Sequence, residues 1–184
     1  YSGYQKEQLI SYLKQFGLEK NRKFGKLSKG EKLKYQFAFA LSTDPKYLIL
    51  DEPTANFDPD FKQDFLNVIM QFMESGKKSV IIASHILDEL DRIADYLIYL
   101  DKGELVYSGD IESFRDKYRI LSGESYKVKL LKQEDIIHAE DRKYGTKALV
   151  VNHGYSKYDG ALTVTVPTLE EFMYHYSKRG ESVI

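Results

Sequence analysis

Apolar residues recur with helical spacing in two segments near the start of the chain. In residues 5–16 they are Leu9, Ile10, Tyr12, Leu13 and Phe16, and Gly17 follows as a suitable C-terminal stop. In residues 28–41 they are Leu33, Phe37, Ala38, Ala40 and Leu41, and the chain leaves through Asp44-Pro45. The pattern predicts two helices joined by a basic, polar linker.

Two short apolar runs follow, and their length is typical of strands. Residues 47–50 read Tyr-Leu-Ile-Leu and lead straight into Asp51 and Glu52, which predicts a strand buried on both faces. Residues 80–83 read Val-Ile-Ile-Ala, and an amphipathic helix around residues 61–73 lies between the two runs. A helix between two strands is a βαβ unit, so we expect a parallel sheet and an α/β fold.

The rest of the chain is rich in β-like segments. Residues 96–100 and 104–108 flank the turn Asp101-Lys-Gly103 and predict a hairpin, followed by a short helix over residues 111–118. Alternation predicts three half-buried strands, at residues 126–130, 147–151 and 161–166. Thr168 and Glu171 form the capping box of a terminal helix. We expect a small α+β appendage over residues 121–184, without chemistry of its own, after a first domain over residues 1–120.

Composition narrows the possible functions. The chain has 184 residues, with Lys+Arg 27 against Asp+Glu 28 and a net charge of -1, so we expect no nucleic acid partner. It contains no cysteine, which excludes disulfides and thiolate metal sites. No apolar run approaches the roughly 20 residues that a membrane-spanning helix needs. There is no signal-peptide pattern and no initial methionine, and we expect the sequence to be a fragment.

Polar side chains that could carry chemistry follow both predicted parallel strands. Asp51 and Glu52 end the first strand, and His85 comes just after the second. Because parallel strands deliver their carboxyl ends to one edge of the sheet, we expect these three residues to lie together there. An acidic turn and a polar loop histidine are the plain structural alternatives.

The start of the second helix has two readings. Ser28 stands at the N-cap with Glu31 three residues later, which predicts a capping box. The unpaired amides of a helix N-terminus beside Gly30 also form a suitable anion site. The remaining histidines, His138, His153 and His175, lack metal-ligand spacing, and we interpret them as surface or hydrogen-bonded residues.

Taken together, these segments resemble the ATPases of ABC transporters. Residues 27–31, Leu-Ser-Lys-Gly-Glu, are similar to the family's Leu-Ser-Gly-Gly-Gln signature, with Lys29 and Glu31 as departures. Residues 48–54, Leu-Ile-Leu-Asp-Glu-Pro-Thr, resemble its Walker B segment, residues 55–58 its D-loop, and the strand ending in Ser84-His85 its switch histidine. The resemblance covers roughly residues 5–120 and implies part of a P-loop NTPase sheet.

The resemblance also implies roles for single residues. Asp51 would hold Mg²⁺ through water, Glu52 would be the general base, and His85 would contact the γ-phosphate and steady Glu52. Ser28 and Gly30 would bind ATP held by a second ATPase subunit, and Asp58 would help to join the two subunits. The implied cofactors are ATP and Mg²⁺. The implied partner besides the second subunit is a transmembrane permease, on the cytoplasmic face of the membrane.

One expected motif of the family is missing. No Gly-x-x-x-x-Gly-Lys-Ser/Thr phosphate loop occurs, and only 26 residues precede Leu27. We therefore expect the C-terminal portion of an ATPase, inactive alone. The run Thr-Leu-Glu-Glu-Phe at residues 168–172 is similar to the end of bacterial drug- and peptide-export ATPases. Two alternatives are a soluble ABC-type ATPase without a transporter, and a regulatory or interaction module with idle ATPase remnants.

Overall fold

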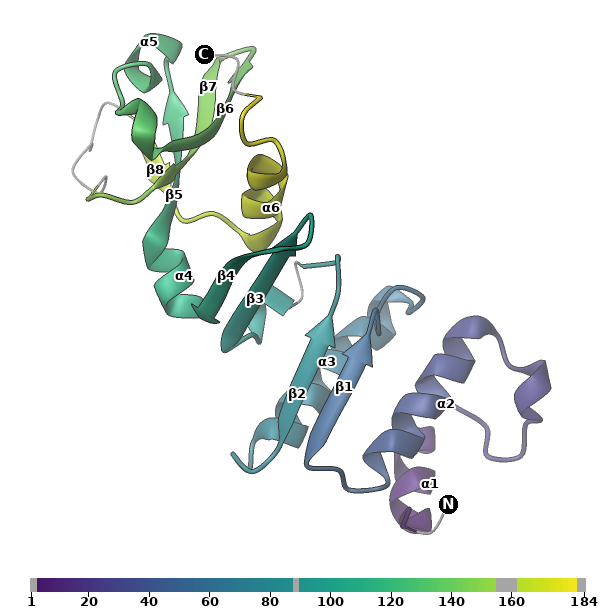
Figure 1. Ribbon diagram of the computed structural model, residues 1–184. Helices are drawn as coiled ribbons and strands as arrows, with labels where there is room; N and C mark the ends of the chain where they lie inside the picture. Colours follow the sequence, from purple (N-terminus) through teal and green to yellow (C-terminus); the bar gives the residue numbers. More distant parts are fainter. Residues whose placement is uncertain (1–2, 88–89, 155–161, 182–184) are drawn as a thin grey trace. The chain divides into compact units, whose positions relative to one another are not determined.

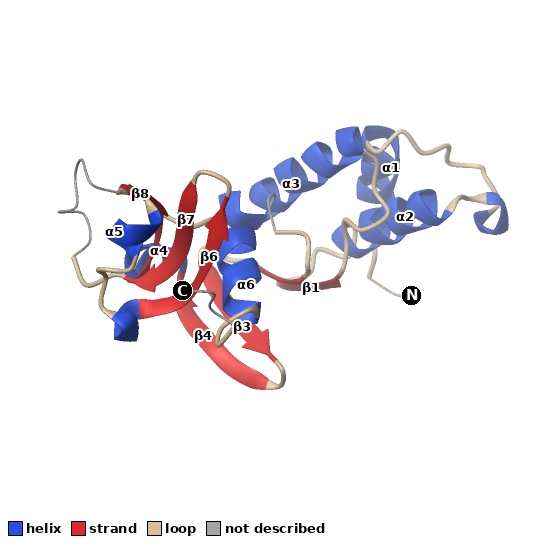
Figure 2. Ribbon diagram, turned by 90° about the horizontal axis from the view of Figure 1, so that it is seen from above, coloured by secondary structure: helices blue, strands red, loops and turns tan. Residues whose placement is uncertain are grey.

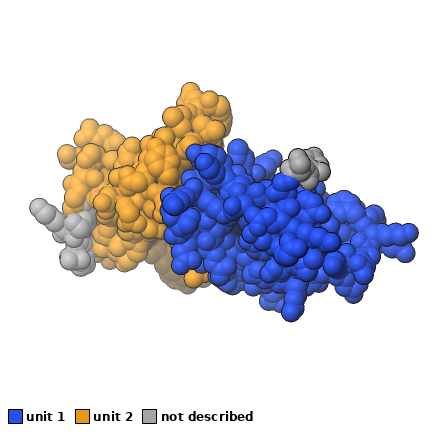
Figure 3. Space-filling model, turned by 90° about the horizontal axis from the view of Figure 1, so that it is seen from below, with its two compact units in different colours: residues 1–86 blue, residues 87–184 orange. Residues whose placement is uncertain are grey.

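The computed structural model describes residues 3–87, 90–154 and 162–181. The chain divides into two compact units, residues 1–86 and residues 87–184 (Figure 3). This division differs from the boundary after residue 120 that the sequence suggested, which stays a prediction. Strand β5, Tyr118–Gly123, runs through that position and is hydrogen-bonded on both sides within the second unit.

Three helices build most of the first unit: α1 (Lys6–Gln15), α2 (Lys29–Leu41) and α3 (Pro59–Met73). A short 3-10 turn, η1 (Phe24–Lys26), precedes α2. Gly17 adopts a φ of 67° just after α1, which confirms the predicted C-terminal stop. Each predicted helix of this region is therefore confirmed to within a few residues.

Five phenylalanine rings hold these helices together. Phe16 lies 5.7 Å from Phe37 and 5.0 Å from Phe61, measured between ring centroids, so it joins α1 to both α2 and α3. Phe65 lies 4.9 Å from Phe37 and 5.7 Å from Phe57, and its side chain is fully buried. Such ring pairs add about 0.5–1.5 kcal/mol each beyond the area that they bury. Helix α2 thus packs against the end of α1 and against α3 through the ring of Phe37.

Two strands complete the first unit, β1 (Tyr47–Asp51) and β2 (Ser79–Ala83). They pair in parallel from Tyr47 opposite Ser79 to Asp51 opposite Ala83, and α3 crosses between them on one face (Figure 1). The parallel βαβ unit predicted from the sequence is therefore confirmed.

The prediction that the first strand is buried on both faces is wrong in this structure. Leu48 is buried on the side of α3, but Ile49 is 75% exposed and Tyr47 is 72% exposed on the other side. Ile81 of β2 is 60% exposed on the same side. Among the described residues of the first unit, helices cover only one face, so alternate side chains face solvent.

The second unit is built on an antiparallel sheet of order β6-β7-β5-β8. Its elements are η2 (Leu90–Arg92), β3 (Tyr96–Asp101), β4 (Glu104–Asp110), α4 (Ile111–Lys117), β5, α5 (Ser125–Val128), η3 (Gln133–Asp135), β6 (Ile136–Arg142), β7 (Gly145–Val151), β8 (Thr163–Thr165) and α6 (Leu169–Ser177). One buried cluster includes Phe114, Leu149 and Phe172. Another includes Leu121, Val128 and Val150. None of the helices formed by described residues is long and apolar enough to span a membrane.

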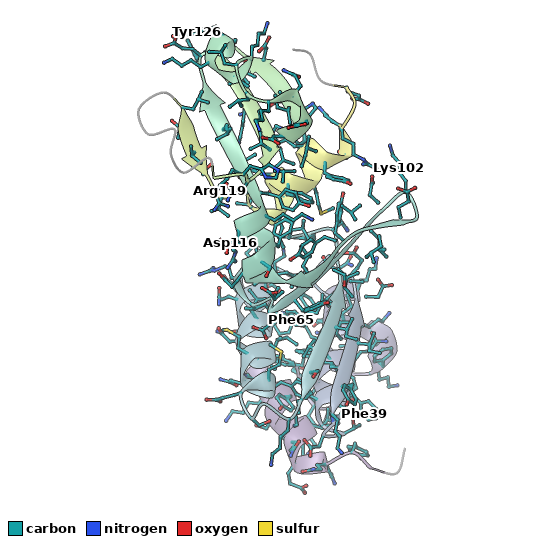
Figure 4. All side chains as sticks on the ribbon, turned by 60° about the vertical axis from the view of Figure 1, so that its left-hand side comes forward. Phe39, Phe65, Lys102, Asp116, Arg119 and Tyr126 are labelled. Carbon is teal, nitrogen blue, oxygen red and sulfur yellow. The ribbon has the colours of Figure 1, made fainter. Side chains whose placement is uncertain are left out.

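The predicted hairpin is formed by β3 and β4. Its turn places Lys102 at a φ of 50° and Gly103 at a φ of 83°, the left-handed pair that a tight type I′ turn requires. Figure 4 shows Lys102 at the tip of this hairpin. One face of the hairpin is exposed and apolar, with Tyr96, Ile98 and Leu100 each at least 60% exposed.

Several predictions for the last third of the chain need correction. The segment at residues 126–130 is not a strand: Ser125–Val128 form helix α5, because Val128 and Leu131 are buried at helical spacing while Tyr126 and Leu130 are exposed. Strand β7 and the capping box of α6 are confirmed. Strand β8 is only three residues long, and Ala161 at the start of the predicted strand lies outside the described residues. The pattern of residues 88–91 also predicts a helix, and Asp88 and Glu89 lie outside the described residues.

We predict that Gly145→Ala strongly destabilises the second unit. Gly145 has a φ of 127°, and an added Cβ would lie 2.2 Å from the carbonyl oxygen of Gly123 in the neighbouring strand. We expect a loss of about 3 kcal/mol or more in the free energy of unfolding, measured by urea denaturation. Gly154→Ala is the control, since Gly154 has a φ of 90° and no atom of the described residues lies within 4 Å of its Cβ position. Its loss should be about 1 kcal/mol, and equal losses in both variants would contradict the role of the clash.

Candidate functional site

Glu52 stands at the carboxyl end of β1 in an unusual backbone conformation. Its amide donates to the carbonyl of Ala83 at 2.8 Å, which continues the parallel ladder one residue past Asp51. Its φ is 44°, in the left-handed region that side-chain-bearing residues rarely occupy. Such a conformation costs on the order of 1–3 kcal/mol and is typical of functional sites.

Three donors from the end of β2 hold the Glu52 carboxylate. His85 approaches Oε1 with its ring Nδ1 at 2.7 Å and with its backbone amide at 3.2 Å. Ser84 donates its hydroxyl to Oε2 at 3.3 Å. The strand ends β1 and β2 thus bring Glu52 and His85 together, as expected from the parallel arrangement, and both strands end at the same edge of the sheet (Figure 1).

These contacts also set the ionisation of Glu52. The hydrogen bond from the His85 side chain is the main cause that holds the pKa of Glu52 below its ordinary value, with smaller effects from the His85 charge and from Ser84. The carboxylate form is therefore favoured at neutral pH. The sequence analysis did not identify Ser84 as a member of this site. Its position directly before His85 could have indicated it.

Asp51 provides a second carboxylate at the same strand end. Its side chain is exposed, and no hydrogen bond or ion pair joins it to another described residue. Carboxylate oxygens are the ligands that Mg²⁺ prefers, so adjacent Asp51 and Glu52 fit a hydrated magnesium ion. Among the described residues, no group of three or more His, Cys, Asp or Glu side chains is placed to hold a metal ion.

Ser28 caps helix α2 as the sequence predicted. Its Oγ accepts from the Glu31 amide at 3.1 Å, and its own amide donates to Glu31 Oε2 at 2.7 Å. Glu31 also pairs with Arg22. The backbone bond from Ser28 is the main cause that lowers the pKa of Glu31. The departure from glutamine in the signature-like segment therefore has a structural explanation, since Glu31 binds both the helix start and the linker before it.

Gly30 lies against the loop that follows Glu52. A Cβ at Gly30 would lie 2.9 Å from the carbonyl oxygen of Asn56, closer than real Cβ contacts allow. The absence of a side chain therefore lets the start of α2 pack on this loop. This close contact accounts for a glycine at position 30 even if no ligand binds there. It also places the N-terminus of α2 beside the segment that leads to Asp58.

Asp58 links the same two elements through its carboxylate. One oxygen accepts from the amide of Phe61 at 2.9 Å and caps α3, and the other lies 2.9 Å from Lys34 Nζ of α2. Lys34 also lies 4.1 Å from the centre of the Phe61 ring. The bond from Lys34 is the main cause that lowers the pKa of Asp58. Sequence reasoning did not identify Lys34, because no local pattern connects residues 24 positions apart.

The other histidines lie in the second unit. His138 and His175 are buried and hydrogen-bonded to each other, which confirms that they are satisfied residues. His153 is exposed and lies 3.5 Å from the Asp135 carboxylate.

Comparison with known families gives one match. Residues 3–55 match the sequence model of the family described as ABC transporter. The matched segment contains the capped start of α2, strand β1 and Glu52.

Curated relatives carry similar names. A putative ABC transporter ATP-binding protein of Mycoplasma pneumoniae is 39% identical over 106 residues, which are 56% of this chain and 32% of that protein. The energy-coupling factor transporter ATP-binding protein EcfA1 of Mycoplasma mobile is 32% identical over 149 residues, 76% of this chain and 54% of that protein. The chain thus spans about a third to a half of the length of these relatives.

Solved structures show the same fold. The dimeric ATP-binding cassette MJ0796 bound to ADP and Pi matches with a TM-score of 0.52 and 24% identity, over 60% of this chain and 51% of that one. A putative cobalt transport ATP-binding protein, cbiO-2, matches with a TM-score of 0.51 and 20% identity, over 83% of this chain and 55% of that one. The α/β fold expected from the sequence is therefore confirmed as that of ATP-binding cassettes.

Proposed function

We propose that this chain is the C-terminal part of the ATP-hydrolysing subunit of an ABC transporter. The observation that carries the proposal is the Glu52 carboxylate, held in a left-handed conformation at the end of β1 by His85 and Ser84. The similarity to ABC transporter ATP-binding proteins supports the same conclusion.

Each residue of the site would then have a separate role in ATP hydrolysis. Mg-ATP, when bound, supplies the phosphoanhydride bond that is broken. Glu52 takes a proton from the attacking water as general base. His85 keeps the Glu52 carboxylate oriented through Nδ1 and steadies the water near the γ-phosphate. Asp51 would hold Mg²⁺ through water, since this ion usually keeps several of its waters in proteins.

Ser28 and Gly30 would serve ATP held by a second subunit. Ser28 Oγ accepts from the Glu31 amide, and a hydrogen bond from its side chain also helps to lower the pKa of Glu31. To serve the partner's ATP, the Ser28 hydroxyl would turn from Glu31 to a phosphate oxygen. The first amides of α2 add further donors at the positive end of the helix. Asp58 lies on the neighbouring loop and would help to join the subunits. The further partner is a transmembrane permease, which places the subunit on the cytoplasmic face of the membrane.

The exposed apolar faces support the proposal that the subunit extends beyond this chain. Parallel sheets are normally covered on both faces, yet Tyr47, Ile49 and Ile81 are at least 60% exposed on the open face of β1 and β2. In the proposed subunit, this face packs against the half that carries the phosphate loop.

The type of transporter is a separate question. The run at residues 168–172 is similar to the end of export ATPases and suggested an export system. However, EcfA1 and a tungstate uptake protein of Peptoclostridium acidaminophilum are among the relatives. The proposal therefore covers ABC transporters in general.

We predict that this chain alone does not bind ATP at physiological concentrations. Asp51, Glu52 and His85 contact only one side of the nucleotide site, and the amides and lysine of a phosphate loop normally supply most of the binding. Calorimetric titration with Mg-ATP should show no saturable heat, whereas the longer protein that contains this sequence should bind and hydrolyse ATP. Micromolar binding by the chain alone would contradict the proposed division of the site, and a longer protein without ATPase activity would contradict the proposed function.

A further inference from the structure

Two buried histidines join helix α6 to strand β6 in the second unit. His138 of β6 is 3% exposed and His175 of α6 is 1% exposed. Their Nδ1 atoms lie 2.8 Å apart, and their ring centroids are separated by 5.0 Å. Figure 2 shows α6 lying alongside β6 and β7. The bond therefore connects the last described helix of the chain to the sheet that it covers.

This geometry is compatible with only some protonation states. A bond between two Nδ1 atoms needs one ring that donates and one that accepts, so at least one ring must be neutral. If both rings carry two protons, two N–H groups and two positive charges face each other across 2.8 Å in a buried site. Double protonation and the docked position of α6 therefore exclude each other.

The neighbouring charges offset this conflict only in part, because burial, the largest cause, lowers the pKa of both rings while Glu140 raises it. Glu140 of β6 is paired with Arg142 and also accepts from Tyr174 of α6 at 2.8 Å. Glu171 of α6 lies 2.5 Å from Lys147 of β7. The remaining charged groups that face the pair are Lys178, at the end of α6, and Glu181 beyond it, which is exposed.

A hollow lies beside one member of the pair. A hollow of about 250 Å³, lined by Arg142, Lys147, Glu170, Glu171, Tyr174 and His175, borders the ring of His175. Burial is the main cause that lowers the pKa of both rings, and the pKa of His175 falls to about 4. Both rings are therefore neutral in the docked state at neutral pH.

We propose that the His138–His175 pair is an acid-sensitive latch, which docks α6 on the sheet when both rings are neutral and releases it when both are protonated. The inference is independent of the ATPase proposal, because none of its residues belongs to the Glu52 site. Such a latch gives the second unit a conformational response to proton concentration.

The direction of the pH dependence follows from the lowered pKa values. Released histidines titrate near the ordinary value of 6.5, while docked His175 titrates near 4. The stabilisation is fully present above pH 6.5 and is lost as the pH falls toward 4. When both rings gain a proton on release, the opening equilibrium increases by up to about 100-fold for each pH unit in this window.

Hydrogen exchange of backbone amides, followed by NMR, tests the latch on the whole chain. Between pH 6.5 and pH 5, after correction for intrinsic exchange rates, we expect the opening of α6 amides such as Phe172 to increase at least about 15-fold relative to amides of β5 such as Leu121. His175 alone accounts for this factor, and the lowered pKa of His138 increases it further. The double variant His138→Leu with His175→Leu should lose this difference, and the exposed His153→Gln should keep it.

A second measurement decides the case even where the double variant does not fold. The ring NMR signals of wild-type His138 and His175 should not titrate near pH 6.5 while α6 remains docked. Rings that both titrate near 6.5 with α6 docked, or an equal pH response in the double leucine variant, would overturn the latch.

Discussion

Glu52→Gln in the longer protein is expected to slow ATP hydrolysis by about 10²–10⁴-fold while ATP binding is retained, because a general base contributes that range. Gln keeps the volume of Glu52 and one acceptor oxygen for His85 Nδ1, 2.7 Å away in the native protein. Its amide cannot take up a proton from water. The variant should therefore accumulate as an ATP-bound dimer, visible by size-exclusion chromatography, while steady-state phosphate release measures the loss of turnover.

Glu112→Gln is the matched control for this variant. Glu112 is an exposed carboxylate on α4 whose partner is Arg115, and it lies in the second unit. Its replacement should leave hydrolysis unchanged. If Glu52→Gln turned over ATP at nearly the wild-type rate, another group would have to activate the water, and Glu52 would be a structural residue of the strand end.

Ser28→Asp is expected to abolish hydrolysis in the longer protein without lowering its stability. As an N-cap, Asp accepts from the Glu31 amide as well as Ser28 Oγ does, so folding should be unaffected. Against a phosphate of the partner's nucleotide, however, a like charge costs several kcal/mol, which corresponds to a loss of dimer by more than about 100-fold. ATP-dependent dimerisation by light scattering and thermal unfolding of the monomer measure the two effects separately.

Ser28→Ala separates the cap from the ligand role. It removes the cap, worth about 1 kcal/mol in unfolding free energy, but introduces no charge. It should therefore be less stable than Ser28→Asp and yet dimerise better. Mixing Ser28→Asp with a phosphate-loop variant leaves one composite site intact, so partial activity should return. A Ser28→Asp homodimer with full activity would show that Ser28 is only a cap.

Local signals in the sequence predicted much of the fold. Residues close together in the sequence determine three of its features: the capping boxes at Ser28 and Thr168 and the left-handed turn at Lys102. The βαβ unit followed from the spacing of two apolar runs around an amphipathic helix. The capping boxes and the turn depend on interactions that are local in sequence. The two strands of the βαβ unit pair over a long separation, from Tyr47 opposite Ser79, but the periodicity of each segment could be read locally.

The elements that the sequence did not predict depend on distant contacts. Strand β6 places His138, a polar residue, at a fully buried position and contains a register irregularity between Ile136 and His138, so its alternation is hidden. In α5, an alternating pattern was misleading, because burial of Val128 and Leu131 under the sheet decides the local structure. At the candidate site, the approach of His85 to Glu52 was predicted, but the Lys34–Asp58 pair and the Gly30–Asn56 contact were not.

The left-handed backbone conformation of Glu52 creates a conflict between stability and activity at this position. At a φ of 44°, glycine would relieve the backbone strain, and it would also remove the carboxylate. A Glu52→Gly protein should therefore resist denaturation at least as well in its strand turn while losing its proposed general base. Thermostability screens of this protein would enrich inactive variants at position 52, so any engineering campaign has to hold this residue fixed and seek its gains elsewhere.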